Sequence, residues 1–274
     1  MISTLVSLSL FVMAAEAGKR GLCWPYYNKP LNPSLFNTGD GNVVAIYDYE
    51  TYAPPSSNGD GGLGFIGMQR CTDCPSSPIA SLASLQSAQG WSTVFTLNEP
   101  DLSVADGNSA YVSPSDAASW YQKNINSLPI KKALPAVTSS TNSGEGLSWL
   151  SQMITACAGS CSYDYINLHW YGNSFADFQS YVESANTQFP GVQIVVTEFA
   201  LGNPAGGQAD QVAFFKSAFA FLDSATYVEL YFPFVATSPS LLTANGGSAD
   251  TVVGTGSCLF NDDGSISAVG ELLV

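Results

Sequence analysis

Two glutamates close apolar runs, and together they have the chemistry of a hydrolytic pair. Glu99 ends the run 94–99 (VFTLNE), and Glu198 ends the run 194–198 (IVVTE). Cleavage of a glycosidic bond with retention needs one carboxylic acid to protonate the leaving oxygen and one carboxylate as nucleophile, about 5 to 5.5 Å apart. Two glutamates on opposite sides of one opening can supply that arrangement. The pair therefore indicates a glycosidase.

Either glutamate taken alone could be a solvated rim residue or a salt-bridge partner. The presence of both, with Asn98 directly before Glu99, favours a reactive site. His169 is the single histidine of the chain, and its ring can orient a carboxylate or a sugar hydroxyl, or make a structural hydrogen bond. One histidine cannot build a metal site by itself, so we expect neither a metal ion nor a cofactor.

The glutamates can meet only if the strands that carry them end at the same edge of a sheet. Short apolar segments, several of them nearly continuous in apolar residues, are typical of parallel strands buried on both faces. Eight such segments are found, at residues 21–24, 43–47, 64–68, 93–99, 133–137, 165–170, 193–198 and 228–232.

Helical patterns with plausible start signals alternate with the later strands, at residues 117–125, 147–156, 175–189 and 211–222. This order predicts an α/β fold, a (β/α)8 TIM barrel, as one domain over residues 18–274. Catalytic groups of such barrels gather at the C-terminal ends of the strands, so Glu99 and Glu198 should share one mouth. Residues 53–62 and 237–257 are expected to be loops.

Five aromatic residues lie at or near the predicted strand ends. Their rings could pack against the C–H faces of sugars while hydroxyl or indole N–H groups bind the ligand. Core packing is the alternative for each. These candidate substrate-binding residues are Trp24, Tyr47, Trp170, Tyr171 and Tyr231.

Composition narrows the ligand class. The formal charge of −14, from 8 basic and 22 acidic residues, would repel nucleic-acid phosphates and anionic lipid, so we expect no nucleic-acid or membrane partner. Only 11% of residues are charged and 12% are aromatic, which suits an uncharged polyhydroxylated ligand. We expect a monomer that binds a polysaccharide.

The N-terminus predicts export. Residues 1–17 contain a short apolar run and end in Ala-Glu-Ala, which is typical of a signal peptide cut after Ala17. The dibasic pair Lys19 and Arg20 is an alternative processing site. We therefore expect a secreted protein, extracellular or in the cell wall.

The six cysteines form an even set that fits disulfides in an oxidising compartment. Six thiols allow 15 pairings, and the sequence does not choose among them. Cys71 and Cys74 can form a short-loop disulfide or belong to a redox or zinc site, and the disulfide is favoured because the other ligands of a zinc site are missing.

Three blocks give the chain a family resemblance. Residues 97–101 (LNEPD), 168–172 (LHWYG) and 196–200 (VTEFA) resemble fungal glycoside hydrolase family 128, of the alkali-sensitive-linkage type. The resemblance implies an endo-acting β-1,3-glucanase with Glu99 as general acid/base and Glu198 as nucleophile. It also implies that Asn98 binds near the sugar 2-hydroxyl.

Two departures from the family pattern put chain-length and linkage preference in question. Residues 68–71 (MQRC) stand where a Trp-Gly pair is common in the family, so we expect Arg70 to reshape that subsite. Residues 231–234 (YFPF) lack the usual tryptophan. Two alternatives stay open: a β-glucan-binding protein of the same fold with little or no turnover, and the same mechanism on cellulose, mannan or a mixed-linkage glucan.

Overall fold

The computed structural model describes residues 18–102 and 111–274. The predicted signal peptide, residues 1–17, lies outside these ranges. Within them, no helix has the length and apolar character needed to cross a membrane.

Nine parallel strands form one sheet in the order β3-β2-β1-β9-β8-β7-β6-β5-β4. The strands are β1 (Arg20–Cys23), β2 (Val43–Tyr47), β3 (Gly64–Phe65), β4 (Gly67–Gln69), β5 (Thr93–Asn98), β6 (Lys131–Val137), β7 (Tyr165–Gly172), β8 (Gln193–Leu201) and β9 (Val228–Pro233).

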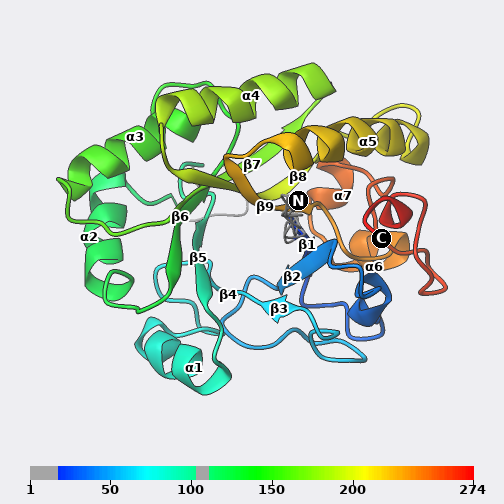
Figure 1. The fold of residues 1–274 in the computed structure, drawn as a ribbon, viewed down its shortest axis with the longest axis horizontal. Coiled ribbons are helices and arrows are strands. Elements are labelled where there is room, and N and C mark those ends of the chain that lie inside the picture. The colour runs from blue at the N-terminus through cyan, green and yellow to red at the C-terminus, as the bar shows by residue number, and fades with distance from the viewer. Residues whose placement is uncertain (1–17, 103–110) are drawn as a thin grey trace, which may run out of the picture.

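The short strands β3 and β4 close the barrel. They flank Ile66, and they share one strand position because β3 pairs with β2 while β4 pairs with β5. The sequence predicted one strand at 64–68, and the structure divides it at Ile66. Eight strand positions result, which confirms the (β/α)8 barrel (Figure 1).

Helices follow the later strands and are replaced by loops near the start. The helical elements are η1 (Pro33–Phe36), η2 (Ile79–Ser81), α1 (Leu82–Gln89), α2 (Pro114–Asn124), α3 (Gly146–Cys157), α4 (Phe175–Gln188), α5 (Gln208–Ser224), α6 (Pro239–Asn245), α7 (Ala249–Val252) and η4 (Gly270–Leu272). Residues 48–63 contain no helix, so the loop predicted at 53–62 is confirmed.

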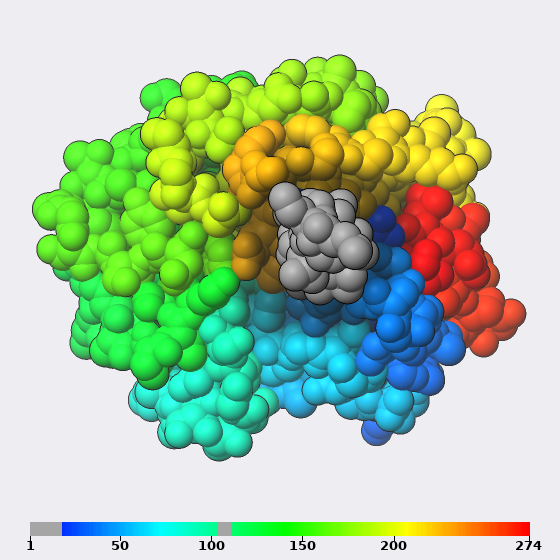
Figure 2. All heavy atoms as spheres, in the orientation of Figure 1, coloured from blue at the N-terminus to red at the C-terminus, as the bar shows by residue number. Residues whose placement is uncertain are grey.

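The prediction of a loop over residues 237–257 is wrong in part, because α6 and α7 lie there. Pro239 occupies the start of α6, where a missing N–H costs nothing, and Leu242 is fully buried. Two short helices with few apolar residues leave no clear period in the sequence. In the space-filling view this C-terminal part lies on the opposite side of the barrel from α2 and α3 (Figure 2).

Aromatic packing fixes the helices to the barrel wall. Trp170 of β7 stacks on Phe214 of α5 at 5.5 Å between ring centroids, and Phe178 of α4 stacks on Phe199 of β8 at 5.0 Å. Such rings bury large apolar areas and pack in specific geometries. The wall behind the strand ends is therefore rigid.

The basic pair next to β1 has a structural role. Lys19 Nζ donates to the carbonyls of Leu222, Asp223 and Ala225 at the end of α5. Arg20 donates to the carbonyls of Leu272 and Leu273, at 3.0 Å each, and pairs with Asp223 at 2.8 Å. These contacts account for both basic residues without a processing protease.

We expect Arg20→Met to lower the free energy of unfolding by about 3 kcal/mol, because a partly buried carboxylate and two carbonyls lose their donor. Urea unfolding measures the change, with Lys29→Met at an exposed position as control. A loss no larger than that of the control would contradict the role of Arg20.

Candidate active site

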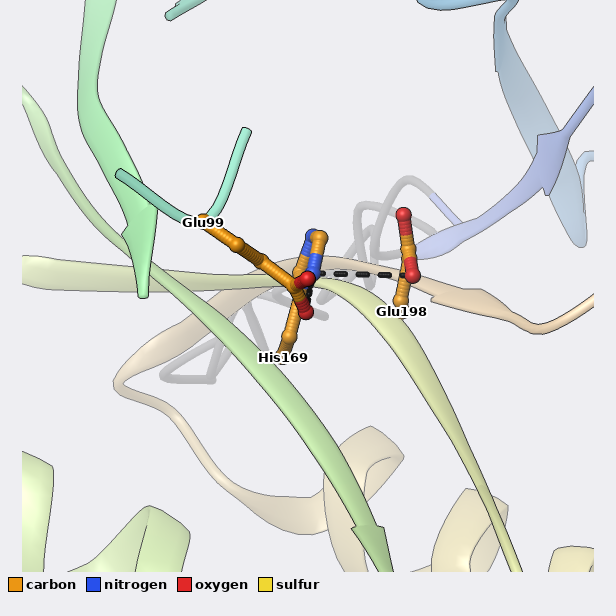
Figure 3. A group of neighbouring side chains, drawn as sticks. All are labelled: Glu99, His169 and Glu198. Atoms are coloured by element: carbon orange, nitrogen blue, oxygen red, sulfur yellow. Dashed lines mark hydrogen bonds and ion pairs between the residues drawn. The ribbon is translucent and has the colours of Figure 1, made fainter. Parts of the chain in front are cut away.

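Glu99, His169 and Glu198 come together, two of them in the C-terminal halves of their strands and Glu99 just after its strand (Figure 3). Glu99 directly follows β5, while His169 of β7 and Glu198 of β8 are register partners. His169 Nδ1 lies 2.9 Å from Glu99 Oε1 and 3.5 Å from Glu198 Oε2. One ligand atom from each residue lies within 4.8 Å of the others. The imidazole therefore stands between the two carboxylates.

The ring of His169 is fixed from behind. Its Nε2 lies 2.9 Å from Thr197 Oγ1, and Thr197 Oγ1 donates its own hydrogen to Asn167 Oδ1 at 2.7 Å. Thr197 can then only accept from the ring, so Nε2 carries a proton. The Nδ1 atom and Glu99 Oε1 consequently have one proton between them, held by the imidazole or by the acid.

The charge of His169 is stabilised by its neighbours. The side chain is 1% exposed, and this burial lowers the pKa of His169. The negative charge of Glu198 and the hydrogen bond to Glu99 have a larger effect in the opposite direction, so the pKa of His169 lies above its usual value. The imidazolium form therefore persists to higher pH than in a free histidine.

Glu198 is held by two tyrosine hydroxyls. Tyr171 donates to Oε2 at 2.5 Å and Tyr49 donates to Oε1 at 2.7 Å. Burial raises the pKa of Glu198 above its usual range and Glu99 adds to this effect, while His169 and the two hydroxyls lower it. The net direction is upward because the carboxylate has little water around it.

Two residues of the site have left-handed backbones. The φ angles are +46° at Glu99 and +65° at Tyr49, a region that costs roughly 1–2 kcal/mol for a residue with a Cβ. Glu99 directly follows β5 and Tyr49 lies two residues after β2, and in both cases a turn redirects the side chain. Sequence reasoning missed Tyr49, whose only signal was its place two residues after the second predicted strand.

The site opens into a cleft of about 610 Å³. Besides Glu99, His169 and Glu198, its lining includes the predicted residues Asn98 and Tyr171. Other lining side chains that sequence reasoning did not single out come from the loop after β1, the end of β9 and the segment of α6 and α7. They include Tyr26, Tyr27, Phe234, Asn245 and Val252.

Four of the predicted substrate-binding aromatics do not line this cleft. Trp24, Tyr47 and Tyr231 are fully buried, and Trp170 is 4% exposed. Adjacent residues of a strand face opposite sides, so Trp170 points away from the barrel axis where His169 and Tyr171 point inward. That alternation was a usable signal in the sequence.

The other three aromatics have hydrogen bonds of their own. Tyr47 packs on Phe95 and Phe232, and its hydroxyl donates to the carbonyl of Thr197 at 2.9 Å. Trp24 donates to the carbonyl of Pro55, and Tyr231 to Asp223. For these residues the structure supports the core-packing alternative.

Arg70 lines the cleft. Its Nη2 lies 3.1 Å from Glu50 Oε1, and Glu50 also accepts from the hydroxyls of Ser76 and Ser77. The predicted disulfide between Cys71 and Cys74 is present in the same loop. The family commonly has a Trp-Gly pair at this position, whereas this chain has Arg70, fixed by its ion pair with Glu50, next to a disulfide-bonded loop.

The remaining cysteines are divided. Cys157 and Cys161 form a second disulfide, whereas Cys23 and Cys258 are free and buried. The expectation that all six are paired is therefore wrong. Cys23 instead lies 2.9 Å from the Tyr49 hydroxyl, next to the site.

The donor set does not favour a metal ion in this arrangement. Glu99, His169 and Glu198 are the right residue types and are close enough to one another. However, Nδ1 of His169 is already hydrogen-bonded to Glu99, and a metal would need that nitrogen lone pair. The three groups are arranged as a proton-sharing cluster.

The comparisons agree with this geometry. Residues 21–272 match the family model described as glycosyl hydrolase catalytic core. The fold is similar to the crystal structure of a GH128 (subgroup IV) endo-β-1,3-glucanase from Lentinula edodes, with 63% identity, a TM-score of 0.88, and coverage of 94% of this chain and 99% of that chain.

Two further relatives are more distant. A GH128 (subgroup III) curdlan-specific exo-β-1,3-glucanase from Blastomyces gilchristii, solved in complex with glucose, has 26% identity and a TM-score of 0.69, covering 93% of this chain and 97% of that one. Alkali-sensitive linkage protein 1 of Schizosaccharomyces pombe is 34% identical over 189 residues, which are 68% of this chain. The match spans only 33% of that relative.

The fold, the family model and the similarity to a solved endo-β-1,3-glucanase together define a glycoside hydrolase. The chain belongs to glycoside hydrolase family 128.

We expect Glu198→Gln to raise the melting temperature at pH 7. The pKa of Glu198 is higher in the folded than in the unfolded protein, so ionisation of this group lowers the free energy of unfolding. Its contribution to stability is fully present below the unfolded-state pKa and is lost as the pH rises through the folded-state pKa. The gain should shrink towards pH 4. Thermal unfolding at both pH values measures it, with the exposed Glu271→Gln as control. A gain that is equal at both pH values, or absent at pH 7, would contradict the burial argument.

Proposed function

We propose that this chain is a secreted, endo-acting hydrolase of β-1,3-glucan that works by double displacement with retention. The observation that carries the proposal is the spacing of the carboxylates, because one oxygen of Glu99 and one of Glu198 lie within 4.8 Å. Retaining enzymes need about 5 to 5.5 Å between the two carboxyl groups, and inverting enzymes need about 6.5 to 9.5 Å to admit a water. The spacing supports retention.

Glu99 acts as the general acid/base in this proposal. Its proton passes to the leaving oxygen, and in the second step it takes a proton from the attacking water. His169 Nδ1 is hydrogen-bonded to Oε1 of Glu99, and its Nε2 is hydrogen-bonded to the Thr197 hydroxyl. The imidazole therefore orients the acid and accommodates either protonation state.

Glu198 is the nucleophile in this proposal and attacks the anomeric carbon. The hydroxyls of Tyr49 and Tyr171 each bind one of its oxygens, which fixes the plane of the carboxylate and favours its ionised form. Asn98 precedes the acid and lines the cleft, where its amide can bind the sugar 2-hydroxyl.

The substrate class is inferred from the Lentinula edodes enzyme, which is an endo-β-1,3-glucanase and shares 63% of its residues with this chain. The exposed ring of Tyr26 in the cleft lining suits packing against a sugar face. Secretion is supported by the two disulfides, since disulfides persist in oxidising compartments. A protein that only bound glycans would need neither carboxylate.

Wild-type protein should hydrolyse linear β-1,3-glucan with retained anomeric configuration, and Glu198→Gln should lower kcat by about 10⁴-fold or more, because an amide cannot form the glycosyl intermediate. Product sizes by chromatography and anomers by NMR test both statements. Inverted products, or turnover by the variant close to that of the wild type, would overturn the assignment. Glucan binding by the wild type without hydrolysis would favour the binding-protein alternative.

Tyr171→Phe should move the acidic limb of the pH–kcat/KM profile to higher pH. The Tyr171 hydroxyl favours the ionised form of Glu198, so its removal raises the pKa of Glu198 further above the value that burial already gives it. As the solution is acidified, Glu198 is then protonated, and activity lost, at a higher pH than in the wild type. The control is Tyr163→Phe, outside the cleft. An acidic limb that stays in place would rule out Glu198 as the group that must be ionised.

A further inference from the structure

A second hollow of about 460 Å³ lies beside the cleft, on the outer wall of the barrel. We call it the α3–α4 groove. One wall is the segment 139–142 after β6 together with the start of α3, the other wall is α4 with Ser180 and Ser184, and Trp170 and Tyr181 also line it. The two helices run along the same side of the molecule (Figure 1).

The groove adjoins the active-site cleft. Ser139 lines both hollows. Thr138, also in the cleft lining, accepts a hydrogen bond at its carbonyl from the Tyr181 hydroxyl at 2.9 Å. A chain that extends beyond the cleft past Ser139 would therefore reach the groove.

Trp170 gives the groove an unused donor. The side chain is 4% exposed and lines the groove, with its ring stacked on Phe214. Among residues 18–102 and 111–274, none accepts a hydrogen bond from its indole N–H. The nitrogen is not one of the fully enclosed unpaired atoms, so water reaches it when no ligand is bound. Trp170 can therefore donate one hydrogen bond to a ligand that carries acceptor oxygens.

The charges of the groove exclude an anionic ligand. No basic side chain occurs among the described residues that line it, and the acids Glu145 and Asp177 do. Both acids accept from neighbouring hydroxyls: Ser140 donates to Glu145 at 2.5 Å and Ser174 donates to Asp177 at 2.7 Å. The remaining lining is mostly hydroxyl and amide groups, which suits a neutral polyhydroxylated chain.

The walls of the groove are fixed in place. Gln188, at the end of α4, donates to Ser151 Oγ at 2.6 Å and to the carbonyl of Leu147 at 3.3 Å, both on α3. With Tyr181 bound to Thr138 nearer the cleft, α4 is tied down at two points. A preformed groove binds without an ordering cost.

We propose that the α3–α4 groove is a second carbohydrate-binding site, which holds the part of a β-glucan chain that extends beyond the cleft. The proposal rests on the proposed substrate class. Sugar oxygens accept from the Trp170 indole and exchange hydrogen bonds with the serine and threonine hydroxyls of the walls. Chains long enough to cover both hollows then bind more tightly than oligosaccharides that fill the cleft alone.

The test uses Glu198→Gln as parent, so that the ligand is bound without turnover. Ser180→Leu with Ser184→Leu fills the groove from α4, and Trp170→Phe removes only the indole donor. Ala176→Leu, exposed on α4 and outside the groove lining, is the matched control. Titration calorimetry compares a short linear β-1,3-gluco-oligosaccharide with a long soluble β-1,3-glucan, and thermal unfolding checks that each variant is folded.

The parent should prefer the long glucan, and filling the groove should reduce the ratio of long-chain to short-chain affinity by about tenfold, the equivalent of one or two hydrogen bonds to a neutral ligand. Trp170→Phe should reduce the same ratio by a smaller factor, and Ala176→Leu should keep it. A parent without long-chain preference, or a filled variant with an unchanged ratio, overturns the groove proposal and leaves the proposed hydrolysis standing. Groove-dependent binding with no hydrolysis by the wild type overturns the proposed function instead.

Discussion

The proposed active site depends on one proton held between His169 Nδ1 and Glu99 Oε1, where the imidazole is almost fully buried and the carboxyl group is partly buried. The position is stable because the opposite nitrogen is bound to Thr197, and Thr197 is bound to Asn167. A carboxylate on each side of the ring would be expensive to bury without this proton. The cluster therefore keeps one acid and one carboxylate close enough to act on the same bond.

The barrel holds these groups in a conformation and an environment that are unfavourable for them. Glu99 and Tyr49 have strained backbones, and Glu198 is ionised only against the effect of burial. Such strain persists only where the surrounding structure fixes it. The aromatic wall around Trp170 and Phe199 behind β7 and β8, and the ties of Arg20 at the other end of the chain, supply that rigidity. Stability and catalytic geometry are in conflict at Glu198, as at many active sites.

Chemistry and substrate selection are carried by different parts of the chain. The proposed reacting groups lie directly after β5 and in the C-terminal halves of β7 and β8, whereas the rest of the cleft lining comes largely from segments outside the regular strands, such as Tyr26 after β1 and Arg70 after β4. Loops tolerate variation that a closed barrel does not. Differences in linkage and chain length within the family are therefore expected at the cleft rim and at the groove rather than among the glutamates and His169.

The sequence by itself determined the barrel and placed Glu99, His169 and Glu198 toward the C-terminal ends of their strands, although β7 and β8 run three residues beyond His169 and Glu198. An apolar run that stops at a polar residue is a local signal, and a closed parallel sheet brings all such ends to one mouth. Alternation along β7 already excludes Trp170 from the cleft, but only the tertiary structure decided which other aromatic rings reach it, because that depends on strand register and on the turn at Tyr49. Both disulfides are local, with separations of 3 and 4 residues. What the sequence did not show is that Cys23 and Cys258, on segments far apart in the chain, stay unpaired, and that residues 239–252 form two helices.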